Sequence, residues 1–146
     1  MNDNITDVIF YTIEKSIKSY RKFAQKRFDQ ARLDITIDQW LVLNCLNKNE
    51  NISQNKLAEL IFKDVASVTR IIDLLVKKEY VIRSFHSSDR RRFNLTITEK
   101  GEAIIREATN IVNENRRAAL TSISDEEVKQ ANLILQKLIT NCEKSQ

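Results

Sequence analysis

Apolar side chains recur every three or four residues along most of this chain, which is the period of an amphipathic helix. The first such stretch covers residues 5–32 and carries a solvated row of lysines on its other face. Ser, Thr and Asp accept hydrogen bonds from the first turn of a helix, so they mark where the others begin. Six helices are expected, beginning at residue 5, at Thr36 or Asp38, after Ser53, after Asp64 (and ending near Lys78), after Thr98, and at the capping box after Ser124.

A change of period interrupts the helices once. The stretch Tyr80–Phe85 is typical of a strand, a polar turn follows at residues 86–91, and residues 93–97 alternate apolar and polar side chains with a period of two. Two short helices joined by a tight turn form a helix-turn-helix, and a hairpin directly after it would be a wing. The sequence therefore predicts a mainly α fold with a small β-wing. The winged helix-turn-helix covers residues 36–98, and helices at residues 1–35 and 99–146 flank it.

The terminal helices carry long apolar stripes that the winged unit alone does not cover. A symmetric homodimer that packs these helices together is the common solution, and a bundle within one chain is the alternative. In the last helix we expect the apolar stripe to be buried. Its residues are Val128, Ala131, Ile134, Leu135, Leu138 and Ile139.

The positive charge is concentrated in the middle of the chain. Residues 51–98 hold nine basic and five acidic side chains, so this third carries the whole net charge of +4. A localised excess of this kind indicates an anion-binding module with neutral flanks.

Scarce residue types exclude several classes of function. The chain has one Gly among 146 residues, so it cannot form a glycine-rich phosphate loop. One His and two distant cysteines are too few ligands for a zinc site within one chain. No metal, cofactor or enzyme motif is expected. There is no apolar run near the length of a membrane span and no signal peptide, so we expect a reduced cytoplasmic protein without disulfides. Cys45 is either a small buried hydrophobe or a redox sensor. Cys142 near the end is expected to be inert, although an exposed thiol there could form a crosslink.

Two segments carry the candidate nucleic-acid contacts. Small polar groups and one Arg face outward near the start of the helix after Asp64, which suits a helix laid in the major groove. Arg70 could instead pair with Asp64 or Asp73, and the wing arginines could form only a solvated tip. The candidate DNA-binding residues are Ser53, Ala66, Ser67, Thr69, Arg70, Asp89, Arg90, Arg91 and Arg92.

Three motifs resemble the MarR family of bacterial transcription regulators. They are residues 37–43 (IDQWLVL), residues 67–78 (SVTRIIDLLVKK), and Asp89-Arg90-Arg91 followed by Ile97-Thr98-Glu99-Lys100-Gly101. The resemblance covers nearly the whole chain in the right order, and it implies a winged-helix homodimer on pseudo-palindromic double-stranded DNA.

The resemblance also implies roles for single residues. The helix with Ser67, Thr69 and Arg70 would enter the major groove. Arg91 would enter the minor groove with Asp89 orienting it, while Arg90 and Arg92 would face phosphates. Two residues depart from the family pattern, because Glu79 and Phe62 stand where glycine is usual at helix ends.

The family often binds small aromatic molecules, which loosens its hold on DNA. Tyr11, Tyr20 and Trp40 could line such an effector pocket, or they could simply be core residues. A peroxide-sensing branch uses a cysteine in the first helix, and this chain has none before Cys45.

The leading hypothesis is a homodimeric, sequence-specific DNA-binding regulator, with repression as the expected sign. The alternative is a winged-helix adaptor that binds protein. An enzyme using carboxylates or lysines is the third hypothesis, and no motif in the sequence supports it.

Overall fold

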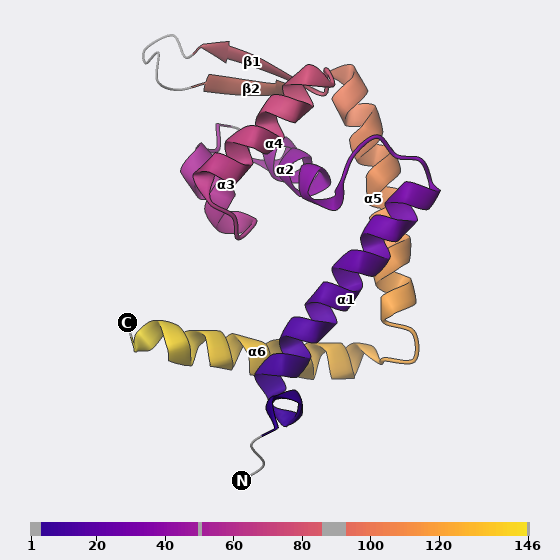
Figure 1. Ribbon diagram of the computed structural model, residues 1–146, viewed down its shortest axis with the longest axis vertical. Helices are drawn as coiled ribbons and strands as arrows, with labels where there is room; N and C mark the ends of the chain where they lie inside the picture. Colours follow the sequence, from indigo (N-terminus) through magenta and orange to yellow (C-terminus); the bar gives the residue numbers. More distant parts are fainter. Residues whose placement is uncertain (1–3, 50, 86–92, 146) are drawn as a thin grey trace. The chain divides into compact units, whose positions relative to one another are not determined.

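The computed structural model describes residues 4–49, 51–85 and 93–145, and within them the chain is mainly helical with one two-stranded sheet (Figure 1). The chain forms two compact units, residues 1–115 and 116–146. The elements are η1 (Ile5–Asp7), α1 (Ile9–Gln30), α2 (Ile37–Lys48), α3 (Gln54–Leu60), α4 (Val65–Lys77), β1 (Val81–Phe85), β2 (Phe93–Ile97), α5 (Glu99–Ala119) and α6 (Asp125–Lys144).

The first helix begins later than the periodicity predicts. Residues 5–7 form a 3₁₀ turn, capped by the Asn4 side chain, which accepts a hydrogen bond of 3.2 Å from the Thr6 amide. Val8 is then extended, with φ −88° and ψ 136°, so α1 begins only at Ile9. The expected helix over residues 5–32 is therefore wrong at both ends, because α1 also stops at Gln30.

Side-chain caps set where the other helices begin. Thr36, and not Asp38, caps α2: its Oγ1 accepts from the Gln39 amide at 3.1 Å, and Gln39 Oε1 accepts from the Thr36 amide at 3.1 Å. Ser124 and Glu127 form the same reciprocal pair at the start of α6, as predicted. The predicted caps of α3 and α4 are also confirmed.

Three helices end on a left-handed residue that is not glycine. Arg32, Phe62 and Glu79 have φ of 57°, 59° and 65° and follow the caps of α1, α3 and α4. At Glu79 the amide donates to Val76 O, and the next amide donates to Leu75 O, which is the Schellman pattern. The helix ends therefore close in the usual geometry even though the chain lacks the glycines that favour it.

The core lies where α2, α3, α4 and the root of the hairpin meet α1 and α5. Gln39 is buried among the apolar residues and takes part in the cap of α2. Trp40 is also buried, and its indole Nε1 donates to Thr109 Oγ1 of α5 at 3.2 Å. The largest fully buried apolar side chains are Phe28, Leu43, Leu57, Ile72, Leu75, Val42, Val68 and Val81.

The hairpin pairs β1 and β2 in antiparallel register, with Val81 opposite Ile97 and Phe85 opposite Phe93. Gly101 lies in the first turn of α5, and because it has no side chain the root of this hairpin packs directly against the α5 backbone. A Cβ on Gly101 would lie 2.2 Å from the Tyr80 carbonyl oxygen and 2.8 Å from Ile97 Cγ2. The helix start and the end of β2 are thus in direct contact.

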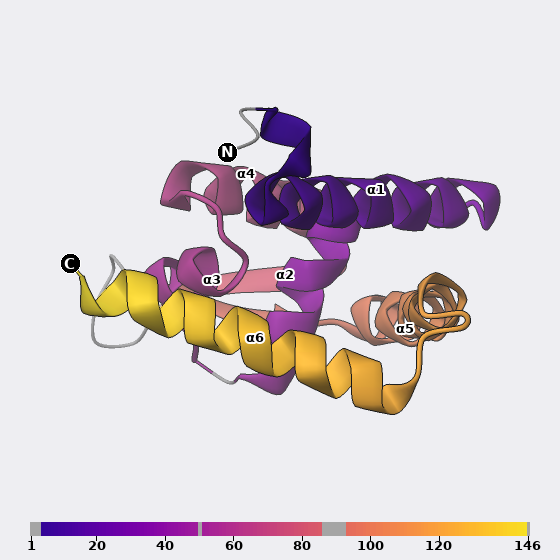
Figure 2. The same cartoon turned by 90° about the horizontal axis from the view of Figure 1, so that it is seen from below.

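The second unit consists of the end of α5, a turn and the uninterrupted helix α6 (Figure 2). The expected burial of the α6 stripe is wrong in a single chain. Leu135 and Leu138 are half-buried, whereas the other four predicted residues are exposed, and Ile134 is 56% exposed. One helix cannot cover its own apolar face, so this stripe needs a partner surface.

Candidate nucleic-acid interface

A chain of hydrogen bonds organises the first turn of α4. Asp64 Oδ1 accepts from the Ser67 amide at 2.7 Å, and Ser67 Oγ donates to Asp64 Oδ2 at 3.1 Å. Arg70 Nη2 in turn donates to Ser67 Oγ at 3.1 Å. These backbone and side-chain hydrogen bonds from Ser67 lower the pKa of Asp64, which keeps its carboxylate charged. Two predicted residues, Ser67 and Arg70, therefore lie together on an exposed helix start, with the guanidinium already oriented.

The Thr69 hydroxyl is hydrogen-bonded within the helix-turn-helix. Its Oγ1 lies 2.9 Å from Val65 O and 3.1 Å from Gln54 Oε1 on α3, so the hydroxyl joins the two helices of the helix-turn-helix. Periodicity does not point to Gln54, and only the packing of α3 on α4 brings it here. Ser53 lies just before it, with its Oγ accepting from the Lys56 amide at 3.1 Å as the cap of α3.

Arg70 pairs with neither carboxylate suggested by the sequence. Asp73 instead accepts a 2.5 Å hydrogen bond from Arg83 Nη2 on β1. Within the described part of the chain Arg70 takes part in no salt bridge, so its positive charge is presented to solvent together with that of the exposed Lys77.

The Arg83–Asp73 pair joins the hairpin to α4. The strands run from this pair toward Phe85 and Phe93, where the described part of the hairpin ends (Figure 1). The predicted wing residues Asp89, Arg90, Arg91 and Arg92 lie in the segment 86–92, outside the described residues. Their assigned roles therefore stay predictions.

A second ionic link joins α1 to the turn before α4. Asp38, at the start of α2, accepts from Arg21 of α1 and lies 3.2 Å from Lys63 Nζ in that turn. Partial burial raises the pKa of Asp38, but the hydrogen bonds to Arg21 and Lys63 outweigh it, and the net pKa is below the usual value. The turn before α4 is thus joined to α1 through the charged carboxylate of Asp38.

Comparisons with known proteins agree with this arrangement. A family model described as the MarR family matches residues 35–93. The helix-turn-helix-type transcriptional regulator SarZ of Staphylococcus aureus is 31% identical over 97 residues, which is 66% of this chain and 62% of SarZ. The chain belongs to the MarR family. Members of this family are transcription regulators and not enzymes.

Solved structures are similar to this chain over more than nine-tenths of its length. A protein of unknown function from Listeria innocua is 30% identical, with a TM-score of 0.69 and 91% of each chain covered. A mutant of MarR from Escherichia coli, solved with operator DNA, covers 94% of this chain and 99% of its own, with a TM-score of 0.82 and 23% identity. The second comparison supports the winged-helix fold.

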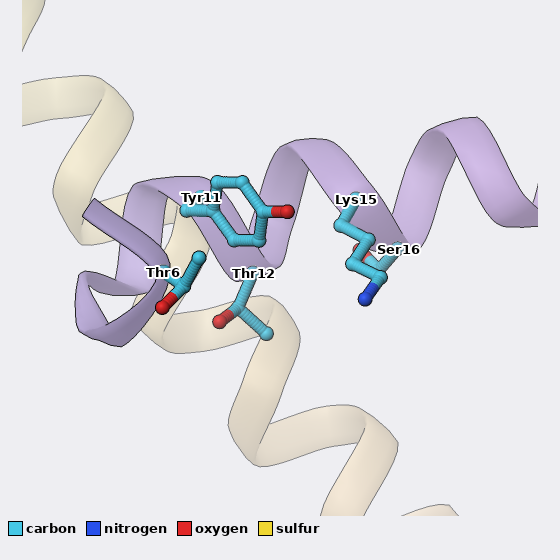
Figure 3. Close-up of a pocket in the computed structure, with 5 residues that line it drawn as sticks. All are labelled: Thr6, Tyr11, Thr12, Lys15 and Ser16. Atoms are coloured by element: carbon cyan, nitrogen blue, oxygen red, sulfur yellow. The ribbon is translucent and has the colours of Figure 1, made fainter. Parts of the chain in front are cut away.

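The three aromatic residues proposed for a MarR-type effector pocket lie in different surroundings. Tyr11 lines an open depression at the start of α1, together with Thr6, Thr12, Lys15 and Ser16 (Figure 3). Tyr20 is half-buried two to three turns further along α1, and Trp40 is in the core. Neither Tyr20 nor Trp40 lines this depression.

The two cysteines and the potential metal ligands are the further candidates for a reactive site. Cys45 is half-buried, and burial raises the pKa of its thiol despite the nearby Lys48, which disfavours a reactive thiolate. Cys142 is exposed. Among the described residues there is no cluster of three or more potential metal ligands, and no helix long and apolar enough to cross a membrane.

Proposed function

We propose that this chain is a homodimeric, sequence-specific DNA-binding repressor of the cytoplasm, which binds a pseudo-palindromic operator and is released by a small aromatic molecule. The observation that carries the proposal is the guanidinium of Arg70, which Ser67 orients on the exposed first turns of α4. An arginine there can form two hydrogen bonds with guanine O6 and N7 in the major groove. The solved complex of the E. coli relative with operator DNA supports this use of the shared fold.

The charge distribution supports the same function. Residues 51–98, which contain α3, α4 and the hairpin, carry the whole net charge of +4. The Arg83–Asp73 pair couples the hairpin to α4, so both could engage one duplex. In this proposal Arg91 enters the minor groove, oriented by Asp89, while Arg90 and Arg92 bind phosphates.

The exposed apolar residues at both ends of the chain support a homodimer. Large patches of this kind on a single chain mark interaction sites. To bind two half-sites of a pseudo-palindrome, the two α4 helices of such a dimer would have to lie about 34 Å apart, one turn of DNA. In η1 and the start of α1 the exposed residues are Ile5, Val8, Ile9 and Phe10, and in α6 they are Val128, Leu133, Ile134 and Ile139.

The direct test is selection of bound sequences from random duplex DNA, followed by titration of the selected site at several salt concentrations. We expect a two-fold symmetric site, and Arg70→Ala should weaken binding about 10- to 100-fold. Arg106→Ala is the matched control, because it removes the same charge from an exposed position on α5. If the folded dimer enriches no sequence above random DNA, the proposal is wrong.

The effector part of the proposal rests on Tyr11 and Lys15. The aromatic ring and the ammonium group border one depression, which suits an aromatic carboxylate (Figure 3). Tyr20 and Trp40, the other two residues suggested for an effector pocket, do not line this depression. A panel of aromatic carboxylates should release the selected DNA from the wild type and not from Tyr11→Ala. If DNA is released equally from the wild type and from Tyr11→Ala, Tyr11 is not part of the effector site. If no compound releases DNA from the wild type, the effector part of the proposal is wrong.

A further inference from the structure

The first turn of α4 exposes two adjacent apolar side chains. Val65 is 42% exposed directly after the cap Asp64, and Ala66, also exposed, follows it. Ala66 lies four residues before Arg70, so the two share one face of the helix. Surface valines are common, but this one adjoins the polar groups of the proposed DNA interface.

The charges around Val65 favour a base edge over the DNA backbone. The Asp64 carboxylate is exposed on the same turn and would repel phosphate. The hydroxyls of this turn are already hydrogen-bonded, that of Ser67 with Asp64 and Arg70 and that of Thr69 with the Val65 carbonyl oxygen. The surface offered at the very start of α4 is therefore apolar and is unsuited to phosphate.

The major groove offers one apolar feature to such a surface, the C5-methyl group of thymine. In the proposed function Arg70 binds hydrogen-bond acceptors of a base, and it lies one turn beyond Ala66 on the same face. We infer that Val65 and Ala66 contact thymine methyl groups beside the base pair read by Arg70. This inference rests on the proposed function, because it names the base chemistry that the same helix selects.

The experiment replaces thymines of the selected operator by deoxyuridine, one position at a time. Deoxyuridine lacks only the methyl group and keeps every hydrogen-bonding atom. At a contacted position the wild type should lose affinity about fourfold, the value of one buried methyl group. In Val65→Ala, the same replacement should have no effect at the position that Val65 contacts.

Leu60→Ala is the matched control, since Leu60 is 43% exposed at the end of α3. This variant should respond to deoxyuridine like the wild type. Unchanged wild-type affinity at every replaced position, with operator binding intact, would overturn the inference and leave the proposed function standing. Absence of any specific DNA binding would remove both.

Discussion

Replacing Gly101 by alanine should destabilise the protein, although alanine is the better helix former. Gly101 is buried in the first turn of α5, and its φ is not positive, so the conformation itself does not require glycine. Helix propensity alone predicts a gain of about 1 kcal/mol for alanine. The contact with the hairpin root predicts the opposite sign.

The added Cβ would lie 2.2 Å from the Tyr80 carbonyl oxygen. That oxygen accepts a 3.1 Å hydrogen bond from the Thr98 amide, so it cannot move without disturbing the junction of hairpin and helix. Overpacking of a tight site costs about 1–3 kcal/mol, and a clash with backbone belongs at the upper end. Subtracting the propensity gain leaves a net loss of about 2 kcal/mol.

Urea unfolding followed by far-ultraviolet circular dichroism would measure this loss, with protein concentration held constant. Ala103→Gly, at an exposed position two residues later, is the control and should cost about 1 kcal/mol through propensity alone. If Gly101→Ala is as stable as the wild type or more so, the Tyr80 carbonyl does not restrict the side chain at position 101, and the prediction is wrong.

Three further outcomes are expected. Phe62→Gly should raise the free energy of unfolding by about 0.5–1 kcal/mol, because Phe62 is 94% exposed at a positive φ, whereas Phe62→Ala in the same urea assay should not. Arg83→Met should weaken operator binding roughly fivefold and leave the salt dependence unchanged, since Arg83 faces Asp73 and not phosphate; a shallower salt slope in the titration would contradict this. Asp38→Asn should lower stability by about 1 kcal/mol at neutral pH. Because folding lowers the pKa of Asp38, this difference should shrink as the pH falls below about 4 in unfolding experiments, and a constant difference would contradict the assigned ion pairs.

Local patterns predicted the elements well, because the groups that start helices are close in sequence to the amides they cap. Ser53, Asp64 and Ser124 were each identified as caps from the sequence, and each accepts the expected hydrogen bond. The return strand at residues 93–97 also matches. Identification of α4 as the exposed, Arg-bearing helix followed from the same periodicity.

Contacts between distant residues were beyond such patterns. The pairing of Asp73 with Arg83 joins a helix to a strand ten residues later, whereas the sequence suggests Arg70 as the partner of Asp73. The contact of Thr69 with Gln54 depends on the angle at which α3 packs on α4. Periodicity shows that α6 has an apolar face that must be buried against some surface. It does not show whether that surface belongs to the same chain, so the predicted burial of α6 is too high for a single chain.

The position of Trp40 has a practical consequence. It is the one tryptophan of the chain, it is buried in α2, and its indole nitrogen is bonded to Thr109 of α5. Its emission should therefore be blue-shifted in the native protein and should move to longer wavelength when α2 separates from α5. The protein thus carries an intrinsic optical probe at the junction of the helix-turn-helix and the helix that leads away from it, and rearrangements there can be timed in solution without a label.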